Sequence, residues 1–138
     1  MILLDTNIVS NTSKALPNER VRAWLDSQER SDLFICSITV AELAFGILTM
    51  PDGHRKQHLA RGLAELLERM GPSCLSFDVL AASEYAKLTA RRRTIGRPIS
   101  IPDAQIAAIA LSSGSTLATL NRKDFDGIEG LKVVDPSV

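Results

Sequence analysis

Short apolar runs alternate with longer, mixed stretches along most of the chain. The apolar runs are too short for helices, so we expect them to form buried strands. These predicted strands are 2–4, 33–38, 74–77, 116–120 and 131–135. The stretches between them predict helices, several of which carry apolar residues at the three- and four-residue spacing of an amphipathic helix. These predicted helices are 17–28, 39–48, 54–71, 79–96 and 102–114.

Residues with known preferences for helix ends mark several of these boundaries. Asn18 and Asp78 are placed to cap the helices that follow them. Gly71, Gly96 and Gly114 stand where the periodic patterns stop, as is common after the last turn of a helix. The boundaries therefore agree with the element types that the apolar pattern predicts.

Strands that alternate with helices imply a parallel sheet covered on both faces. We therefore predict an α/β protein, an α/β/α sandwich with a central, mostly parallel sheet. A turn at 51–53 separates two consecutive helices, and no repeat or long linker divides the chain. Residues 1–138 are predicted to form a single domain, a length at which roughly two thirds of the unfolded surface can be buried.

Composition narrows the class of protein. The chain is 45% apolar and 23% charged, and its sixteen basic and sixteen acidic residues cancel, so no strong overall field indicates a nucleic-acid or membrane partner. Cys36 and Cys74 show no zinc-binding spacing, and we interpret them as reduced core residues. No apolar run approaches the 18 residues of a membrane span. We expect a cytoplasmic protein with no membrane association.

Acidic residues stand at the junctions where strands give way to helices. Asp5 ends the first strand, Glu42 lies early in the helix after the second, and Asp103 opens the helix 102–114. At a fourth junction the strand 116–120 runs into Asn121, with Asp124 three residues on. Each acid has a structural alternative, because Thr39-x-x-Glu42 and Ser100-x-x-Asp103 both fit a helix-capping pattern.

Two observations favour a metal-binding or catalytic role for these acids over helix capping. Asp103 shares a helix face with apolar residues that should pack on the sheet, namely Ile106, Ala107, Ala110 and Leu111. Acids from separate strands also meet at one edge of a parallel sheet, where ligands bind. Clustered carboxylates repel one another unless a cation lies among them, and oxygen ligands without His or Cys suit Mg²⁺ or Mn²⁺. Such an ion can activate a water for attack on a phosphodiester.

Four segments together resemble one protein family. They are "LLDTNIVS" (3–10), "ITVAELAFGI" (38–47), "IPDAQIAAIA" (101–110) and "TLATLNRKDFDGIEGLKVVDP" (116–136). In this order and spacing the chain resembles the PIN-domain toxins of the VapC type, including FitB-like members, across essentially its whole length. The resemblance implies a PIN-like α/β/α fold and a single PIN domain. It also implies a toxin that cleaves structured RNA, often tRNA, with Mg²⁺ or Mn²⁺.

The resemblance also assigns partners and site residues. It implies a VapB-type antitoxin whose tail covers the acids, in a homodimer or an antitoxin-bound hetero-oligomer. Position by position, Asp5, Glu42 and Asp103 match the family's three core acids, with Asp5 and Asp103 as metal ligands. Thr6, Asn7 and Thr119 match the polar residues beside them. Asn121 stands where some family members carry a fourth acid, and Asp124 is the nearest substitute catalytic acid, so the sequence leaves the fourth role open between them.

Other charged residues carry weaker signals. Arg91, Arg92 and Arg93, with Arg97 beyond them, are candidates for contacts with RNA phosphates, although a charge run at a helix end is commonly a solvated face. The histidines at 54 and 58 have a spacing that can bind zinc. They lack a third ligand and the Glu of the H-E-x-x-H motif, so we expect exposed histidines that bind no metal.

Two alternative functions remain open from the sequence. The first is a phosphohydrolase that uses Asp5 as nucleophile, although that chemistry favours a second acid at the position of Asn7. The second is a PIN-fold binding module that acts chiefly as partner of a DNA-binding antitoxin, with its nuclease weak or lost. The presence of all three core acids argues against this second alternative.

Overall fold

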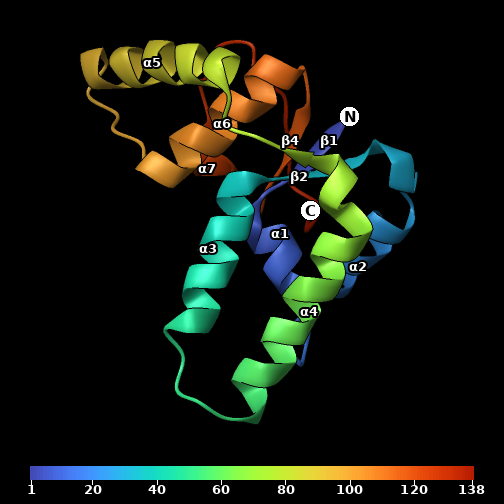
Figure 1. The fold of residues 1–138 in the computed structure, drawn as a ribbon. Helices are drawn as coiled ribbons and strands as arrows, with labels where there is room; N and C mark the ends of the chain where they lie inside the picture. The colour runs from blue at the N-terminus through green and yellow to red at the C-terminus, as the bar shows by residue number, and fades with distance from the viewer.

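A wholly parallel sheet forms the centre of the molecule. The computed structural model describes every residue from Met1 to Val138. Five strands lie in the order β3-β2-β1-β4-β5 (Figure 1). They are β1 (Ile2–Leu4), β2 (Leu33–Cys36), β3 (Cys74–Leu75), β4 (Thr116–Ala118) and β5 (Val133–Val134). All five predicted strands are confirmed, β1 at its full length and the other four in shorter form, and every neighbouring pair is parallel.

Seven α-helices connect and cover these strands. They are α1 (Thr6–Asn11), α2 (Glu19–Asp26), α3 (Ser37–Leu48), α4 (His54–Met70), α5 (Val79–Thr94), α6 (Ile101–Ser113) and α7 (Arg122–Phe125). Short 3₁₀ turns precede β2 and β3 at Arg30–Asp32 and Gly71–Ser73. The five predicted helices correspond to α2 through α6. The short helices α1 and α7 were not predicted from the apolar pattern, and none of the helices combines the length and apolarity that crossing a bilayer requires.

Alternate strand residues build two cores, one on each face of the sheet. Leu3 and Leu117 pack with residues of α5, α6 and α7 on one face. Leu4 and Ala118 pack with residues of α1 and α2 on the other, where partly buried side chains of α3 and α4 join them. Successive strand residues point to opposite faces, so the same three-residue strands supply both cores. The predicted α/β/α sandwich is confirmed.

Most of the expected helix ends are confirmed. Asn18 accepts hydrogen bonds from two backbone N–H groups of α2, and the Asp78 carboxylate accepts one from Ala81 at 2.9 Å. Gly114 ends α6 with a left-handed φ of +67°. Gly71 differs: α4 ends before it, but the glycine keeps a right-handed φ of −52° because the chain continues directly into a 3₁₀ turn.

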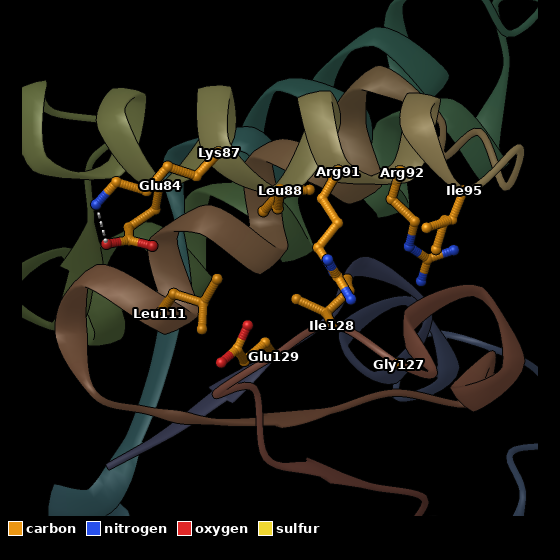
Figure 2. A pocket seen from close by; sticks show the side chains of 10 residues that line it. All are labelled: Glu84, Lys87, Leu88, Arg91, Arg92, Ile95, Leu111, Gly127, Ile128 and Glu129. Atoms are coloured by element: carbon orange, nitrogen blue, oxygen red, sulfur yellow. Dashed lines mark ion pairs between the residues drawn. The ribbon is translucent and has the colours of Figure 1, made fainter.

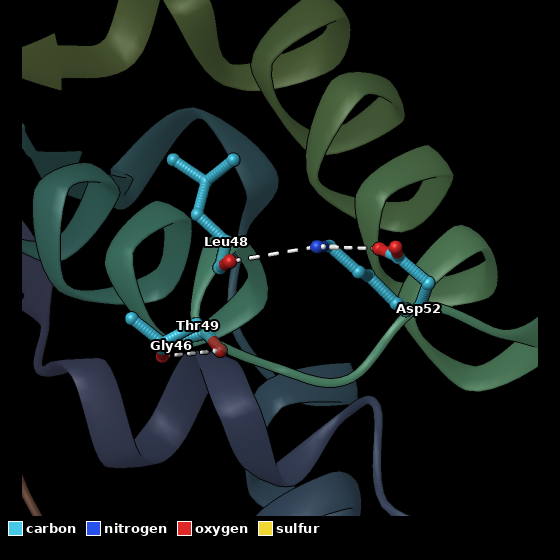
Figure 3. A network of polar contacts seen from close by, with 5 residues as sticks. Gly46, Leu48, Thr49 and Asp52 are labelled. Atoms are coloured by element: carbon cyan, nitrogen blue, oxygen red, sulfur yellow. Dashed lines mark hydrogen bonds and ion pairs between the residues drawn. The ribbon is translucent and has the colours of Figure 1, made fainter.

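The helices α3 and α4 form a hairpin that extends away from the sheet (Figure 1). Residues 49–53 join them around the predicted turn. Lys56 of α4 supports this connection, because its ammonium donates to the carbonyl of Leu48 at 3.4 Å and pairs with Asp52 at 3.1 Å. Figure 3 labels both of these partners. The Thr49 hydroxyl contacts the Gly46 carbonyl at 3.2 Å. These contacts satisfy carbonyl groups that the end of α3 leaves without helical partners.

Candidate active site

Asp5 lies at the carboxyl edge of the sheet and is only 4% exposed. Register places it beside Thr119, because Leu4 pairs with Ala118 in the strands that precede both residues. The Thr119 hydroxyl donates to Asp5 Oδ2 at 2.7 Å, and the backbone N–H of Thr6 donates to Oδ1 at 2.7 Å. The same aspartate therefore caps α1 and presents a buried carboxylate at the end of β1.

Asp5 lies at the point in the sheet where the order of the strands reverses. From β1 the chain proceeds through β2 to β3 on one side, and the later strands β4 and β5 lie on the other. In open parallel sheets the connections diverge at such a point and leave a crevice at the carboxyl ends of the strands. Asp5 and Thr119 follow the two strands, β1 and β4, that meet at this point.

Glu42 reaches Asp5 through Thr6. The Thr6 hydroxyl donates to Glu42 Oε1 at 2.8 Å and lies 3.1 Å from the hydroxyl of Thr39. The capping alternative for Glu42 is wrong, because α3 begins at Ser37 and not at Thr39. Thr39 is buried inside the helix and Glu42 lies in its second turn, so the carboxylate faces the site and caps nothing.

Asn7 joins α1 to the segment that follows β4. Its side-chain oxygen accepts from the backbone N–H of Leu120 at 3.2 Å, and its amide nitrogen lies 3.4 Å from the Thr119 hydroxyl. The backbone N–H of Asn121 also donates to that hydroxyl, at 3.1 Å. Thr6 thus contacts Asp5 directly and Asn7 contacts its partner Thr119, whereas Asn121 contributes its backbone and leaves its side chain exposed.

Asp103 lies in the first turn of α6 and is half-buried. Ser100 is the N-cap and accepts from the backbone N–H of Asp103 at 3.3 Å. The helix face that Asp103 shares with Ile106, Ala107 and Ala110 is buried, as the sequence pattern predicted. The cap belongs to Ser100, so the Asp103 carboxylate remains available to the site.

The four acids are linked electrostatically. Burial raises the pKa of Asp5; hydrogen bonds from Thr119 and Thr6 lower it, and the charges of Asp103 and Glu42 raise it further. Burial also raises the pKa of Asp103, the hydrogen bond with Ser100 lowers it, and the charge of Asp124 raises it. Asp5 is therefore the centre of the group. The convergence of acids is confirmed, whereas their catalytic roles stay predictions.

The donor set can be compared with the needs of a divalent cation. Around Asp5 it consists of carboxylate and hydroxyl oxygens, the ligand type that Mg²⁺ prefers. No three Asp, Glu, His or Cys side chains are arranged to hold an ion on their own. Mg²⁺ requires only one or two carboxylates and retains several waters, so Asp5 and Asp103 fit such an ion without a complete protein cage.

Asp124 lies on α7, at the border of a cavity of about 400 Å³ that Asp103 also lines. It is exposed and has no direct contact with Asp5. Arg92 fixes the position of α7, because its Nη2 donates to the carbonyls of Asp124 at 3.1 Å and Asp126 at 2.8 Å. Asp124 is therefore next to Asp103 among the acids, and it is further from Asp5 than Asp103 is.

The arginine candidates for RNA contact separate into different environments. Arg92 is 6% exposed and its guanidinium donates to a loop carbonyl, so it does not lie on a solvated helix face; contact of any of the four arginines with RNA stays a prediction. Arg91 lines another groove, between α5 and residues 127–129 (Figure 2). Arg93 is exposed beside Pro98, outside the cavity of Asp103. Arg97 does line that cavity, and so does Lys123, a residue that the sequence analysis missed although it directly precedes Asp124.

The histidines and cysteines play no part in this site. His54 and His58 are both exposed on α4, and no cluster of metal-ligating side chains surrounds them. Cys36 is buried and Cys74 is partly buried, and neither forms a disulfide. The expected exposure of the histidines and the core position of Cys36 are confirmed.

Comparison with known proteins agrees with this geometry. A model of the PIN domain matches residues 2–131. The VapC ribonuclease Y4jK of Sinorhizobium fredii is 39% identical over 99% of this chain and 97% of its own length. The toxin FitB of Neisseria gonorrhoeae is 39% identical over 91% of each chain. The crystal structure of FitAcB from that organism superimposes with a TM-score of 0.92 at 37% identity, covering 99% of this chain and 98% of the other.

A further similar structure is a complex with DNA. The structure of VapBC2 from Rickettsia felis, bound to a DNA fragment from their promoter, has a TM-score of 0.84 at 26% identity and covers 97% and 98% of the two chains. The family match spans nearly the whole chain, and these relatives share its length as well as its fold. The chain belongs to the PIN-domain family.

Proposed function

We propose that this protein is a metal-dependent endoribonuclease, the VapC-type toxin of a type II toxin–antitoxin pair, and that it cleaves structured RNA such as tRNA. The observation that carries the proposal is the buried Asp5 carboxylate, linked through Thr6 to Glu42 and flanked by Asp103. The similarity to a VapC ribonuclease at 39% identity supports RNA as the substrate.

Asp5 and Asp103 are the residues that would hold Mg²⁺ or Mn²⁺. Each oxygen of Asp5 accepts one hydrogen bond from the protein and keeps further acceptor capacity, since a carboxylate oxygen can accept more than one. A bound divalent ion supplies a water of lowered pKa and neutralises charge on the phosphodiester. Burial, with a smaller contribution from neighbouring carboxylates, raises the pKa of both aspartates, and a nearby cation would favour the ionised form of each.

The remaining residues position these two ligands and the reacting water. Thr119 and the Thr6 backbone hold the Asp5 side chain in one orientation from opposite sides. Glu42 accepts a hydrogen bond from Thr6 and retains one oxygen to orient a water near Asp5. Asp124 borders the cavity on the far side of Asp103 and is placed to bind an outer water. Asn121 brings no charge, so Asp124 takes the fourth acidic role.

A VapB-type antitoxin is the proposed partner. The similar structures of FitAcB and of VapBC2 with promoter DNA are assemblies, and this supports a homodimer or an antitoxin-bound hetero-oligomer for this chain in the cytoplasm. The acids at the sheet edge suit an arginine of such a partner, because a guanidinium pairs bidentately with carboxylates. Inhibition would then use the same charges as catalysis.

The sequence alternatives fit the geometry less well. An aspartate nucleophile must reach a phosphorus atom, whereas Asp5 is 4% exposed and both of its oxygens accept hydrogen bonds. A pure binding module would have no need of a buried acid whose neighbours Glu42 and Asp103 repel its charge. Neither alternative accounts for Thr6 connecting Asp5 to Glu42.

The direct test is cleavage of RNA. Purified protein is incubated with total cell RNA in Mg²⁺, in Mn²⁺ and in EDTA, beside Asp5→Asn. We expect discrete fragments only from the wild type with metal. Intact RNA under every condition, from folded wild-type protein, would overturn the nuclease assignment.

The toxin assignment is tested in cells. Strong expression of the wild type alone should arrest growth, and co-expression of the small protein encoded beside it should restore growth. Asp5→Asn should be harmless at equal expression. Normal growth with abundant soluble wild-type protein would contradict the toxin assignment while leaving the nuclease test independent.

A further inference from the structure

The cavity beside the acids contains an unusual set of basic residues. It lies between the α5–α6 connection, residues 95–100, and α7, and has a volume of about 400 Å³. Asp103 and Asp124 line it together with Arg92, Arg97 and Lys123. None of these three bases takes part in an ion pair, although carboxylates line the same cavity.

Arg92 is a buried cation with spare hydrogen-bonding capacity. Both of its protein hydrogen bonds come from Nη2 and go to carbonyl oxygens, which carry no compensating charge. No fully buried side-chain nitrogen in the molecule lacks a partner, so its remaining N–H groups border open space. A guanidinium with five donors and two bonds retains donors for a further acceptor.

Arg97 lies close to Arg92. Burial lowers the pKa of Arg92, and the positive charge of Arg97 lowers it further, while Asp124 and Asp126 act in the opposite direction. The guanidinium of Arg97 also rests near the loop after α7, since its Nη1 would lie 3.4 Å from a Cβ on Gly127. Two like charges are thus held near each other without a bridging carboxylate, an arrangement that an anion stabilises.

We propose that Arg97 and Lys123 form a binding subsite for an RNA phosphate next to the one that is cleaved. This inference rests on the proposed ribonuclease function and specifies how that site holds its substrate. Arginine binds phosphate through two parallel hydrogen bonds, and lysine adds a point charge. Arg92 is a positioning residue: it holds the carbonyls of α7, which carries Lys123 and Asp124, and adds positive charge to the cavity.

The subsite also explains how an acidic site can attract RNA. Asp5, Glu42, Asp103 and Asp124 repel a polyanion, and the net charge of the chain is zero, so no overall field compensates. Local cations beside the acids provide the attraction where the backbone must bind. Because they lie at the border of the acids, these cations would bind the RNA backbone beside the scissile phosphate and not at it.

The test measures RNA binding apart from cleavage. A fluorescent single-stranded RNA oligonucleotide is titrated with protein in EDTA at several KCl concentrations, and its anisotropy is recorded. Arg97→Gln and Lys123→Gln should each weaken binding about tenfold, as expected for loss of a charge-assisted hydrogen bond. Each should also reduce the slope of log Kd against log salt by about 0.7, the value for one phosphate on a single strand.

A charge-matched control separates this subsite from a general effect of net charge. Arg61→Gln removes the same charge from the exposed surface of α4 and should leave both the affinity and the salt slope at their wild-type values. With Mg²⁺ present, the two cavity variants should raise KM and largely retain kcat, because they bind the substrate beside the reacting phosphate. Circular dichroism of each variant verifies folding.

The outcomes distinguish the subsite from the function on which it rests. If the wild type cleaves RNA with Mg²⁺ but Arg97→Gln and Lys123→Gln bind like Arg61→Gln, the subsite is wrong and the ribonuclease stands. If the wild type neither binds nor cleaves RNA, both proposals fail. A loss confined to the two cavity variants, with a reduced salt slope, supports the subsite.

Discussion

Replacing Asp5 by Asn tests the electrostatic account of the site without relying on RNA. The buried carboxylate has a raised pKa, because burial and the charges of Asp103 and Glu42 all disfavour its ionised form. Asparagine keeps the size of the side chain and can still accept from the Thr6 backbone while its amide faces the Thr119 hydroxyl. We therefore expect Asp5→Asn to melt at a higher temperature than the wild type in EDTA at neutral pH.

A divalent ion should reverse this order. At a free metal concentration one hundred times Kd, binding stabilises the folded state by about 2.7 kcal/mol. An unfolding entropy of roughly 2.1 cal/mol/K per residue gives about 0.29 kcal/mol/K for this chain. The wild type should therefore gain about 9 °C. If loss of the Asp5 charge weakens binding about one hundredfold, the same metal stabilises Asp5→Asn by only about 0.4 kcal/mol, or about 1 °C.

The assay is thermal unfolding followed by far-ultraviolet circular dichroism, first in EDTA and then in millimolar MgCl₂ or MnCl₂. Asp52→Asn is the matched control, because its carboxylate is exposed on the α3–α4 connection and pairs only with Lys56. This variant should keep the full metal response. Equal responses of wild type and Asp5→Asn, or a large loss of stability of Asp5→Asn in EDTA, would refute the reasoning.

Three further predictions concern the same group of residues. In EDTA the free energy of unfolding of the wild type relative to Asp5→Asn should fall as pH rises from about 4, because the folded state holds the Asp5 proton above its ordinary pKa of 3.8. Urea titrations across pH should show a slope of at most about 1.36 kcal/mol per pH unit. A free-energy difference that grows as pH rises would contradict the direction of the pKa shift. Thr119→Val removes the donor to Asp5 Oδ2 and should cost about 1–3 kcal/mol in urea unfolding at neutral pH, whereas Thr119→Ser should retain most of the stability. Asp103→Asn should abolish RNA cleavage at saturating Mg²⁺. Asp124→Asn should leave a measurable rate roughly 10–100-fold below wild type, since Asp124 is exposed and acts on the other acids only through its charge on Asp103. Equal inactivity of the two variants would contradict this indirect role of Asp124.

The apolar pattern predicted the elements that bury the most surface. Runs such as 2–4 and 116–120 became strands because each supplies side chains to both cores. The helix α1 could not be found in this way, since its six residues begin directly after a strand and span under two turns. The four-residue helix α7 carries no periodic signal at all, and Arg92, 30 residues earlier in the chain, holds it in place.

The sequence predicted the edge of the sheet at which the acids lie, but it could not predict the hydrogen bonds that link them. Asp5, Glu42 and Asp103 follow strands or begin helices, and a parallel sheet brings such positions together. The bond from Thr6 to Glu42 depends on the turn by which α1 leaves β1, which no pattern in the sequence reveals. The sequence could not distinguish Arg92 from its exposed neighbours, because which arginine of the three is buried depends on which face of α5 meets α7.

The arrangement around Asp5 implies a competition between its two proposed ligands. Hydrogen bonds from Thr6 and Thr119 compensate part of the cost of burying the charge, and a cation would relieve the remaining repulsion from Glu42 and Asp103. A divalent ion and an antitoxin arginine both supply that positive charge, and both would occupy the same carboxylates. Because binding of one excludes the other, each ligand raises the apparent Kd of its competitor as its own concentration exceeds its own Kd. The buried charge that makes the metal-free fold less stable therefore makes the site responsive to both ligands.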